Sequence, residues 1–207
     1  MRLLGKTTSI NVRKVLWTCA VIGLPVTPEP WGSGTAHSCD EPEFLRLNPN
    51  GMVPVLIEDG MALWESNTIC RYLAARHGRG DLLPAGPMQR AQVEKWMDWQ
   101  AAELNPAWRH AFMGLVRKHP DFADPARIEA SATQWNRLMG LIDRQLDATG
   151  AYLAGHEFTL ADIVVGLSTN RWLCTPIGRP ELPAVAAWYK RLSAQPGFAQ
   201  HCANGVA

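Results

Sequence analysis

The segments 48–56 and 63–67 constrain the fold of this chain more than any other feature. They combine an Asn-Pro pair, a Val53-Pro54 step before an apolar stretch, a turn, a second apolar stretch, and an acid and a serine that open a helix. X-Pro bonds adopt the cis form far more readily than other peptide bonds, so Val53-Pro54 is a candidate cis peptide that turns the Val53 backbone outward. Helix N-termini bind carboxylates through backbone N–H groups and the helix dipole, and Ser66 stands at such a terminus. The pattern predicts an edge that pairs with an extended peptide, beside a carboxylate-binding helix start.

Residues 1–77 alternate short apolar stretches with two helical patterns. One helical pattern ends at Gly23, a stop signal, and its apolar face carries Val12, Val15, Leu16 and Cys19. The run 58–60 between two apolar stretches is a hairpin signal. Strands are expected over 2–6, 26–31, 55–57 and 61–64, and a second helix over 66–76; Pro28 and Pro30 place the second strand at an edge. The order is β-α-β, a loop, then β-β-α, which matches a thioredoxin-like domain.

Strand signals vanish after a linker over 78–87, which is rich in glycine and proline. The rest of the chain predicts helices over 88–117, 125–148, 159–173 and 183–194. Thr159 and Asp162 are spaced like a capping box at the start of one of them. We therefore expect an α/β thioredoxin-like N-terminal domain over 1–78 and an all-α C-terminal domain over 87–207.

The composition excludes several classes of protein. The 207 residues are 47% hydrophobic with a net charge of +1, so no basic stripe indicates nucleic acid. There is no signal-peptide pattern after Met1 and no apolar run of the roughly 18 residues that a membrane span needs. The five cysteines are odd in number, far apart and without a CxxC pair, which favours reduced thiols and no zinc site. Nine tryptophans indicate large aromatic surfaces in a core or a ligand cleft.

These motifs together strongly resemble the cytosolic glutathione transferase family, in particular its bacterial theta- and nu-like members of the serine/asparagine type. The resemblance covers nearly the whole chain, including the helix start over 159–162. It implies a cytoplasmic, homodimeric detoxification enzyme that uses glutathione as co-substrate and needs no metal.

The loop 6–11 joins the first strand to the first helix and carries several small hydrogen-bonding side chains. Ligands of open α/β sheets sit at the carboxyl ends of strands, so this loop suits stabilisation of an anion such as a thiolate. Ser, Thr and Asn are also ordinary helix N-caps, which is the alternative explanation. The resemblance favours Ser9 as the residue that holds the glutathione sulfur, then Asn11, then Thr8. The loop holds no tyrosine or cysteine, which argues against tyrosine-type enzymes and against members that form mixed disulfides.

The resemblance also implies how the peptide is held. Val53 and Pro54 would pair with the cysteinyl backbone of glutathione, Glu65 would take the γ-glutamyl ammonium and Ser66 the γ-glutamyl carboxylate. For Glu65 and Ser66, the alternative is a simple helix cap. His37 is the one candidate for the basic residue that family members often place near the glycine carboxylate, but its spacing favours a free surface histidine.

The helical half would supply the pocket for the electrophile. Trp108, Phe112 and Trp172 are the candidates, with Arg109 beside them, although an aromatic stripe at helical spacing also suits a core. Arginines are costly to bury, so Arg109 and Arg171 would need an anion nearby. Arg109, like Arg117, could instead be a solvated surface charge.

Three functions fit the sequence. The preferred one is conjugation of a glutathione thiolate to a small hydrophobic electrophile. The second is glutathione-dependent reduction of disulfides or peroxides at the same site, and the third is a non-catalytic binding or scaffold protein of the same fold. A zeta-type isomerase is disfavoured, because its serine- and cysteine-rich run is replaced here by Thr7-Thr8-Ser9-Ile10.

Overall fold

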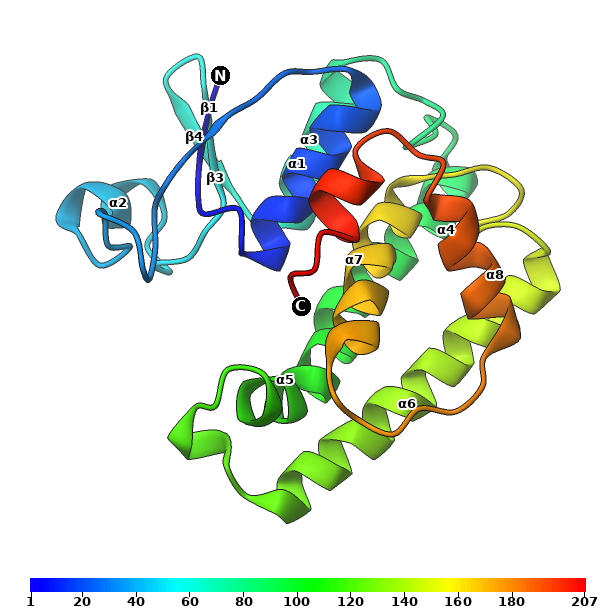
Figure 1. Ribbon diagram of the computed structural model, residues 1–207. Helices are drawn as coiled ribbons and strands as arrows, with labels where there is room; N and C mark the ends of the chain where they lie inside the picture. Colours follow the sequence, from blue (N-terminus) through cyan, green and yellow to red (C-terminus); the bar gives the residue numbers. More distant parts are fainter.

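The computed structural model describes residues 1–207 (Figure 1). Its N-terminal part contains a four-stranded mixed sheet. The spatial order is β2-β1-β3-β4. β1 pairs in parallel with β2 and antiparallel with β3, with Leu3 opposite Leu56. β2 is a two-residue edge strand, as the prolines around it require. The strands are β1 Arg2–Leu4, β2 Pro28–Glu29, β3 Val55–Glu58 and β4 Met61–Trp64.

Alternating side chains of the sheet face two different layers. Leu3 and Leu56 belong to the main core with α1 Ile10–Ile22 and α3 Ser66–Arg76, whereas Leu4 and Val55 pack with Phe44 of α2 on the opposite face. Figure 1 shows α1 and α3 on one side of the strands and α2 on the other. α2 Pro42–Leu47 lies where a loop was expected. It has six residues and one buried side chain, too few for helical periodicity to show in the sequence.

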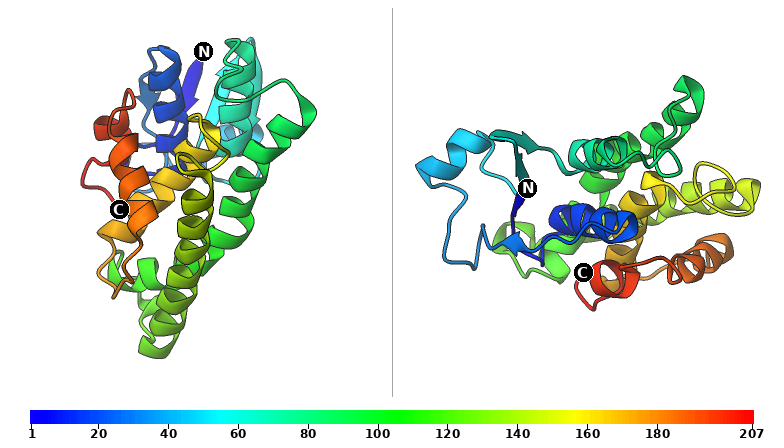
Figure 2. Two further views of the ribbon diagram at one scale, coloured as in Figure 1. Left: turned by 90° about the vertical axis from the view of Figure 1, so that its right-hand side faces the viewer. Right: turned by 90° about the horizontal axis from the view of Figure 1, so that it is seen from above.

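The second part of the chain is helical throughout. Figure 2 shows α6 and α7 between α4 on one side and α8 on the other. α7 is buried along almost its whole length, which makes it the central helix. The elements are α4 Pro87–Trp99, η1 Gln100–Leu104, α5 Asn105–Leu115, η2 Pro120–Phe122, α6 Pro125–Thr149, α7 Leu160–Cys174, α8 Pro183–Leu192 and η3 Phe198–Cys202.

The single helix expected over 88–117 is interrupted, which corrects that prediction. η1 is a π-helical turn between α4 and α5, and α5 begins with Pro106 in its first turn. Proline has no N–H for the preceding turn and its ring crowds the carbonyl four residues back, so a wider turn relieves both problems. The polar side chain of Gln100 is fully buried at this interruption.

The predicted capping box at the start of α7 is confirmed. Asp162 is fully buried and accepts hydrogen bonds from the Thr159 N–H (2.9 Å), the Thr159 hydroxyl (3.1 Å), the Leu153 N–H (3.0 Å) and the Trp188 indole N–H (2.9 Å). Burial nevertheless raises the pKa of this carboxyl to about 6. One side chain thus fixes the start of α7, the loop before it and α8.

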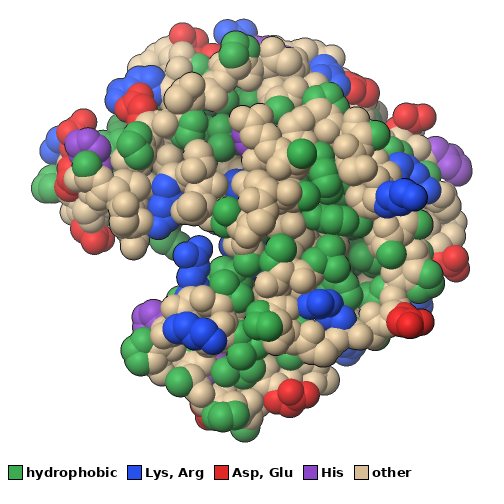
Figure 3. Space-filling model, viewed as in Figure 1, with side chains coloured by type: hydrophobic (Ala, Val, Ile, Leu, Met, Phe, Trp, Pro, Cys, Tyr) green, Lys and Arg blue, Asp and Glu red, His purple; other side chains and the backbone are tan.

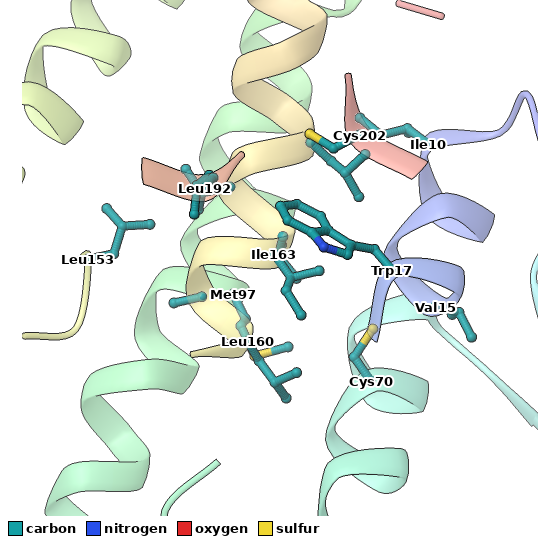
Figure 4. Close-up of a cluster of buried hydrophobic side chains, with 14 of the residues drawn as sticks. Ile10, Val15, Trp17, Cys70, Met97, Leu153, Leu160, Ile163, Leu192 and Cys202 are labelled. Atoms are coloured by element: carbon teal, nitrogen blue, oxygen red, sulfur yellow. The ribbon is translucent and has the colours of Figure 1, made fainter. Parts of the chain in front are cut away.

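The sheet domain and the helical part share one apolar core. Trp17 of α1 is fully buried, and its indole lies among Ile163, Leu192 and Cys202 of the helical part (Figure 4). Its ring packs edge-on against Phe198 at 5.5 Å, and its N–H donates to the Pro196 carbonyl at 3.0 Å. This contact fixes α1, and with it the loop that precedes α1, against the helical domain.

The architecture is the expected one, an α/β thioredoxin-like N-terminal domain and an all-α C-terminal domain. The limits 1–78 and 87–207 stay a prediction. No helix combines the length and the apolar character needed to cross a bilayer.

Candidate active site

A small hollow of about 110 Å³ lies where the start of β3 meets the start of α3. The predicted cis peptide between Val53 and Pro54 is present at its edge. The hollow contains all four residues expected to bind the peptide, together with three asparagines and a methionine: Asn11, Asn48, Asn50, Met52, Val53, Pro54, Glu65 and Ser66. Asn50 and Met52 were not predicted as site residues, although both lie inside the motif 48–56.

Asn48 shapes the loop that presents Val53. Its buried amide donates to the Met52 carbonyl at 2.7 Å, and its side-chain oxygen accepts from the Asn50 N–H at 3.0 Å. These bonds close the turn ahead of Pro54 and hold the backbone of 52–53 at the rim of the hollow. Asn48 therefore has a structural role in the motif.

Glu65 adopts an unusual backbone conformation beside the hollow. Its φ is +70°, in the region that non-glycine residues avoid, and such a conformation costs about 1–3 kcal/mol. It directly precedes Ser66, the first residue of α3, and neither side chain caps the helix. Glu65 thus occupies the N-cap position of α3 without a capping hydrogen bond from its side chain, and both side chains border the hollow.

A larger cleft of about 730 Å³ adjoins the hollow, and Asn11 lines both. In the space-filling view, a notch separates the sheet domain from the region of α5, and Lys and Arg side chains lie along its margins (Figure 3). Apolar and aromatic side chains form much of its wall: Ile10, Met52, Pro106, Trp108, Phe112 and Met113. No aspartate or glutamate lines it.

The three candidate sulfur-binding residues occupy different positions. Ser9 is at the N-cap position of α1, but its hydroxyl makes no capping hydrogen bond, and it lines the cleft. Asn11 lies in the first turn of α1, at the junction of the cleft and the hollow. Thr8 is exposed and lines neither. The structure thus brings Ser9 and Asn11 to the site and leaves Thr8 outside it.

The helical wall of the cleft is aromatic. Trp108 packs edge-on against Phe112 with ring centroids 5.4 Å apart, and its indole N–H donates to Asn105 at 3.1 Å. Arg171 of α7 lies over both rings, at 4.4 Å from Trp108 and 4.1 Å from Phe112. Burial, aided by the positive charges of two other arginines, lowers the pKa of Arg171 to about 9. Arg109 also lines the cleft, as expected, and Arg117 joins it.

Trp172 is not part of this cleft, which corrects its assignment to the pocket. Its indole N–H donates to Asn136 at 2.8 Å, and it lines a separate cavity with Arg179 and Tyr189. Adjacent residues on a helix point about 100° apart, so Arg171 and Trp172 face different neighbours. His37 is exposed, stacks on Trp31 at 4.7 Å and lines neither cavity.

A buried polar network, which local sequence patterns did not predict, lies behind the site. Lys14 of α1 is 1% exposed, and its ammonium donates to Asn67 at 3.1 Å and to Gln100 at 2.7 Å. Gln100 in turn donates to Asn105 at 2.7 Å and to Ser168 at 2.9 Å. Burial lowers the pKa of Lys14 to about 8. The network links α3, next to Ser66, to the aromatic wall of the cleft.

Comparison with known families agrees with this geometry. The model of the glutathione S-transferase N-terminal domain matches residues 1–75, and that of the C-terminal domain matches residues 107–196. The chain therefore belongs to the glutathione S-transferase family.

Individual relatives show which glutathione S-transferases this chain is similar to. The chain is 38% identical over 198 residues to glutathione S-transferase GstB of Escherichia coli K12, covering 94% of this chain and 93% of that protein. It is 34% identical over 208 residues to glutathione S-transferase 3 of Zea mays, covering 96% and 91%. The theta class enzyme of Xanthomonas axonopodis pv. citri, solved with glutathione bound, superposes with a TM-score of 0.89 at 39% identity, covering 97% and 96%. The protein is thus an enzyme, a glutathione S-transferase of the bacterial theta-like type.

Proposed function

We propose that this enzyme binds glutathione in the hollow, activates its thiol as a thiolate at the start of α1, and conjugates it to a hydrophobic electrophile in the cleft. The observation that carries the proposal is that Asn11 lines both spaces. A tripeptide paired with Val53 would thus place its sulfur beside the wall formed by Trp108 and Phe112.

The side chains of the hollow suit the parts of glutathione. The Glu65 carboxylate complements the γ-glutamyl ammonium, and the Ser66 hydroxyl and N–H at the start of α3 complement the γ-glutamyl carboxylate. Val53 and Pro54 offer an unpaired backbone edge to the cysteinyl residue. The matched test is Ser66→Ala, which should raise the KM for glutathione about tenfold, the loss of roughly one charge-assisted hydrogen bond. A KM unchanged from wild type would remove Ser66 from the site.

Thiolate formation requires a defined free energy. A free thiol has a pKa near 8.5, and lowering it by two units takes about 2.7 kcal/mol. A charge-assisted hydrogen bond contributes about 1.5–3 kcal/mol, and a helix N-terminus adds about 0.3–1 kcal/mol. Ser9 or Asn11, together with the N-terminus of α1, is therefore sufficient. We rank Ser9 first, because its hydroxyl is not engaged in capping the helix.

The test is the ultraviolet absorbance of bound glutathione thiolate as a function of pH. In the wild type, the bound thiol should titrate about two units below the free one. Ser9→Ala or Asn11→Ala should reverse most of that shift, and Thr8→Ala, outside both spaces, is the matched control. If neither of the first two variants has an effect, the sulfur assignment is wrong. Binding without a shifted pKa would contradict thiolate activation, and no binding would favour a scaffold role.

Two further properties complete the proposal. Relative rates with an aryl halide and with a disulfide distinguish conjugation from glutathione-dependent reduction. We also propose a cytoplasmic homodimer with a role in detoxification. The five free cysteines suit a reducing compartment, and members of the family generally form dimers.

A further inference from the structure

The cleft carries more positive charge than conjugation of a neutral electrophile requires. Four cationic side chains line it, Lys6, Arg109, Arg117 and Arg171, and no acidic side chain balances them. The adjoining hollow, where glutathione is proposed to bind, has no lysine or arginine in its lining. The positive charge therefore lies in the cleft, and three of its four carriers belong to the helical part that also supplies the aromatic wall.

Arg171 shows that no carboxylate side chain neutralises this charge. The residue is 3% exposed, yet it takes part in none of the ion pairs of the structure. Its buried Nε has no hydrogen-bond partner, and Nη2 makes one long bond of 3.3 Å to the backbone oxygen of Ala207. Buried charges in proteins are normally paired, so a guanidinium in a cleft wall with no aspartate or glutamate beside it indicates an anionic ligand as its partner.

The neighbours of Arg171 raise its need for an anion. Arg13 and Arg117 both act on it with like charge. Arg13 is buried as well and donates to neutral groups, the side chain of Asn204 and the Val206 carbonyl, both at 2.8 Å. Trp108 and Phe112 offer ring faces to Arg171, but these faces carry no net charge. An anion in the cleft would offset the repulsion and complete the bonding of Arg171.

From this arrangement we infer that the electrophile is an aromatic molecule bearing an anionic group such as a carboxylate, which the guanidinium groups of Arg171, Arg117 and Arg109 bind. The inference rests on the proposed function and names the substrate class of that site. The ring packs against Trp108 and Phe112, and the anion points to the arginines. With an aryl chloride, the glutathione sulfur forms a bond to the ring carbon, the carbon–chlorine bond breaks, and chloride leaves with the electron pair. The thiol proton passes to solvent.

A matched pair of substrates tests the inference on the wild-type enzyme: 4-chloro-3-nitrobenzoate and its neutral carboxamide, 4-chloro-3-nitrobenzamide. Each kcat/KM is divided by the uncatalysed rate with glutathione, which removes the difference in intrinsic reactivity. The benzoate should show a rate enhancement at least about tenfold above that of the benzamide, corresponding to one charge-assisted hydrogen bond. The ratio should fall as salt is added, because exposed charges are screened. A ratio of one or less would overturn the inference, while turnover of the benzamide would leave the proposed function standing.

Arginine variants identify the side chains that bind the anionic group. Arg117→Gln and Arg109→Gln, at exposed positions, should each lower the benzoate-to-benzamide ratio severalfold, and Arg171→Lys should lower it further. Arg144→Gln is the control, because Arg144 is an exposed arginine beside aromatic rings of a different cavity. If none of the three cleft variants changes the ratio, the arginines do not bind the anion and the inference is wrong.

If the enzyme consumes neither halide, calorimetric titration of the two glutathione conjugates decides. Tighter binding of the carboxylate conjugate supports the assignment of the cleft even though the proposed chemistry fails. Equal binding of the two conjugates, or no binding of either, overturns it.

Discussion

Replacement of Lys14 by methionine tests the buried network directly. Lys14 is fully buried and pairs with two neutral amide oxygens, those of Asn67 and Gln100. Its pKa falls from 10.5 to about 8, and 2.5 units at 1.36 kcal/mol each correspond to about 3 kcal/mol. Between these two values the unfolded chain binds a proton that the folded protein has released. Lys14 alone should therefore add about 3 kcal/mol to the free energy of unfolding as the pH increases from 8 to 10.5, so the wild type should gain that amount relative to a variant without this lysine.

Methionine fills a similar volume but does not titrate, so Lys14→Met lacks this pH-dependent gain in the free energy of unfolding. Near pH 7 the two proteins should differ little, because the variant loses two hydrogen bonds but also avoids burying a charge. The difference in the free energy of unfolding should then widen steadily above pH 8. Urea unfolding at fixed protein concentration, repeated at intervals between pH 7 and pH 10.5, measures it.

Lys190→Met is the matched control, because Lys190 is an exposed lysine on α8. Its curve should stay parallel to that of the wild type over the whole range. A difference between wild type and Lys14→Met that does not change with pH would refute the reasoning, since it would mean that the Lys14 ammonium is hydrated in the native protein.

Three more predictions concern the helical domain. Asp162→Ala should lower the free energy of unfolding by on the order of 3 kcal/mol in urea, because it removes the cap of α7 and leaves the Trp188 N–H buried without an acceptor; a loss below about 1 kcal/mol would contradict this. Gly140→Ala should stabilise α6 by about 0.5–1 kcal/mol, because its Cβ meets only the end of a flexible side chain 3.7 Å away. Gly114→Ala should instead lower the melting temperature, because its Cβ would lie 2.4 Å from the Phe122 carbonyl oxygen. If Gly114→Ala gains stability as Gly140→Ala does, the argument from the contact between the Gly114 position and the Phe122 carbonyl is wrong.

Most secondary structure was accessible from the sequence, because it depends on local signals. Gly23 does end α1 in a left-handed conformation, and Ser66 does begin α3. The hairpin β3–β4 turns at residues 59–60, both with positive φ, as its turn residues indicated. The motif proposed to bind the peptide is equally local: Val53, Pro54, Glu65 and Ser66 meet in one hollow because a short hairpin brings the ends of the motif together.

Which residues line the cleft depends on how the helices are rotated relative to each other. Trp108 and Phe112 were found on its wall, since one turn of α5 puts both on the same face. Trp172 was not, because the face that α7 turns towards α5 is decided by packing along its whole buried length. The same rotation brings Arg171, rather than its neighbour, onto the two rings.

The sequence by itself determined the order of elements, the two-part architecture and the loop and helix starts proposed to hold a tripeptide, because these follow from turns, caps and periodicity within short segments. Only the tertiary structure decided which charges are buried and with whom. Lys14 finds its partners 53 and 86 residues along the chain, and Arg171 pairs with no aspartate or glutamate side chain. The pKa values and ligand preferences of such groups depend on desolvation and on distances across the core, which sequence spacing does not set.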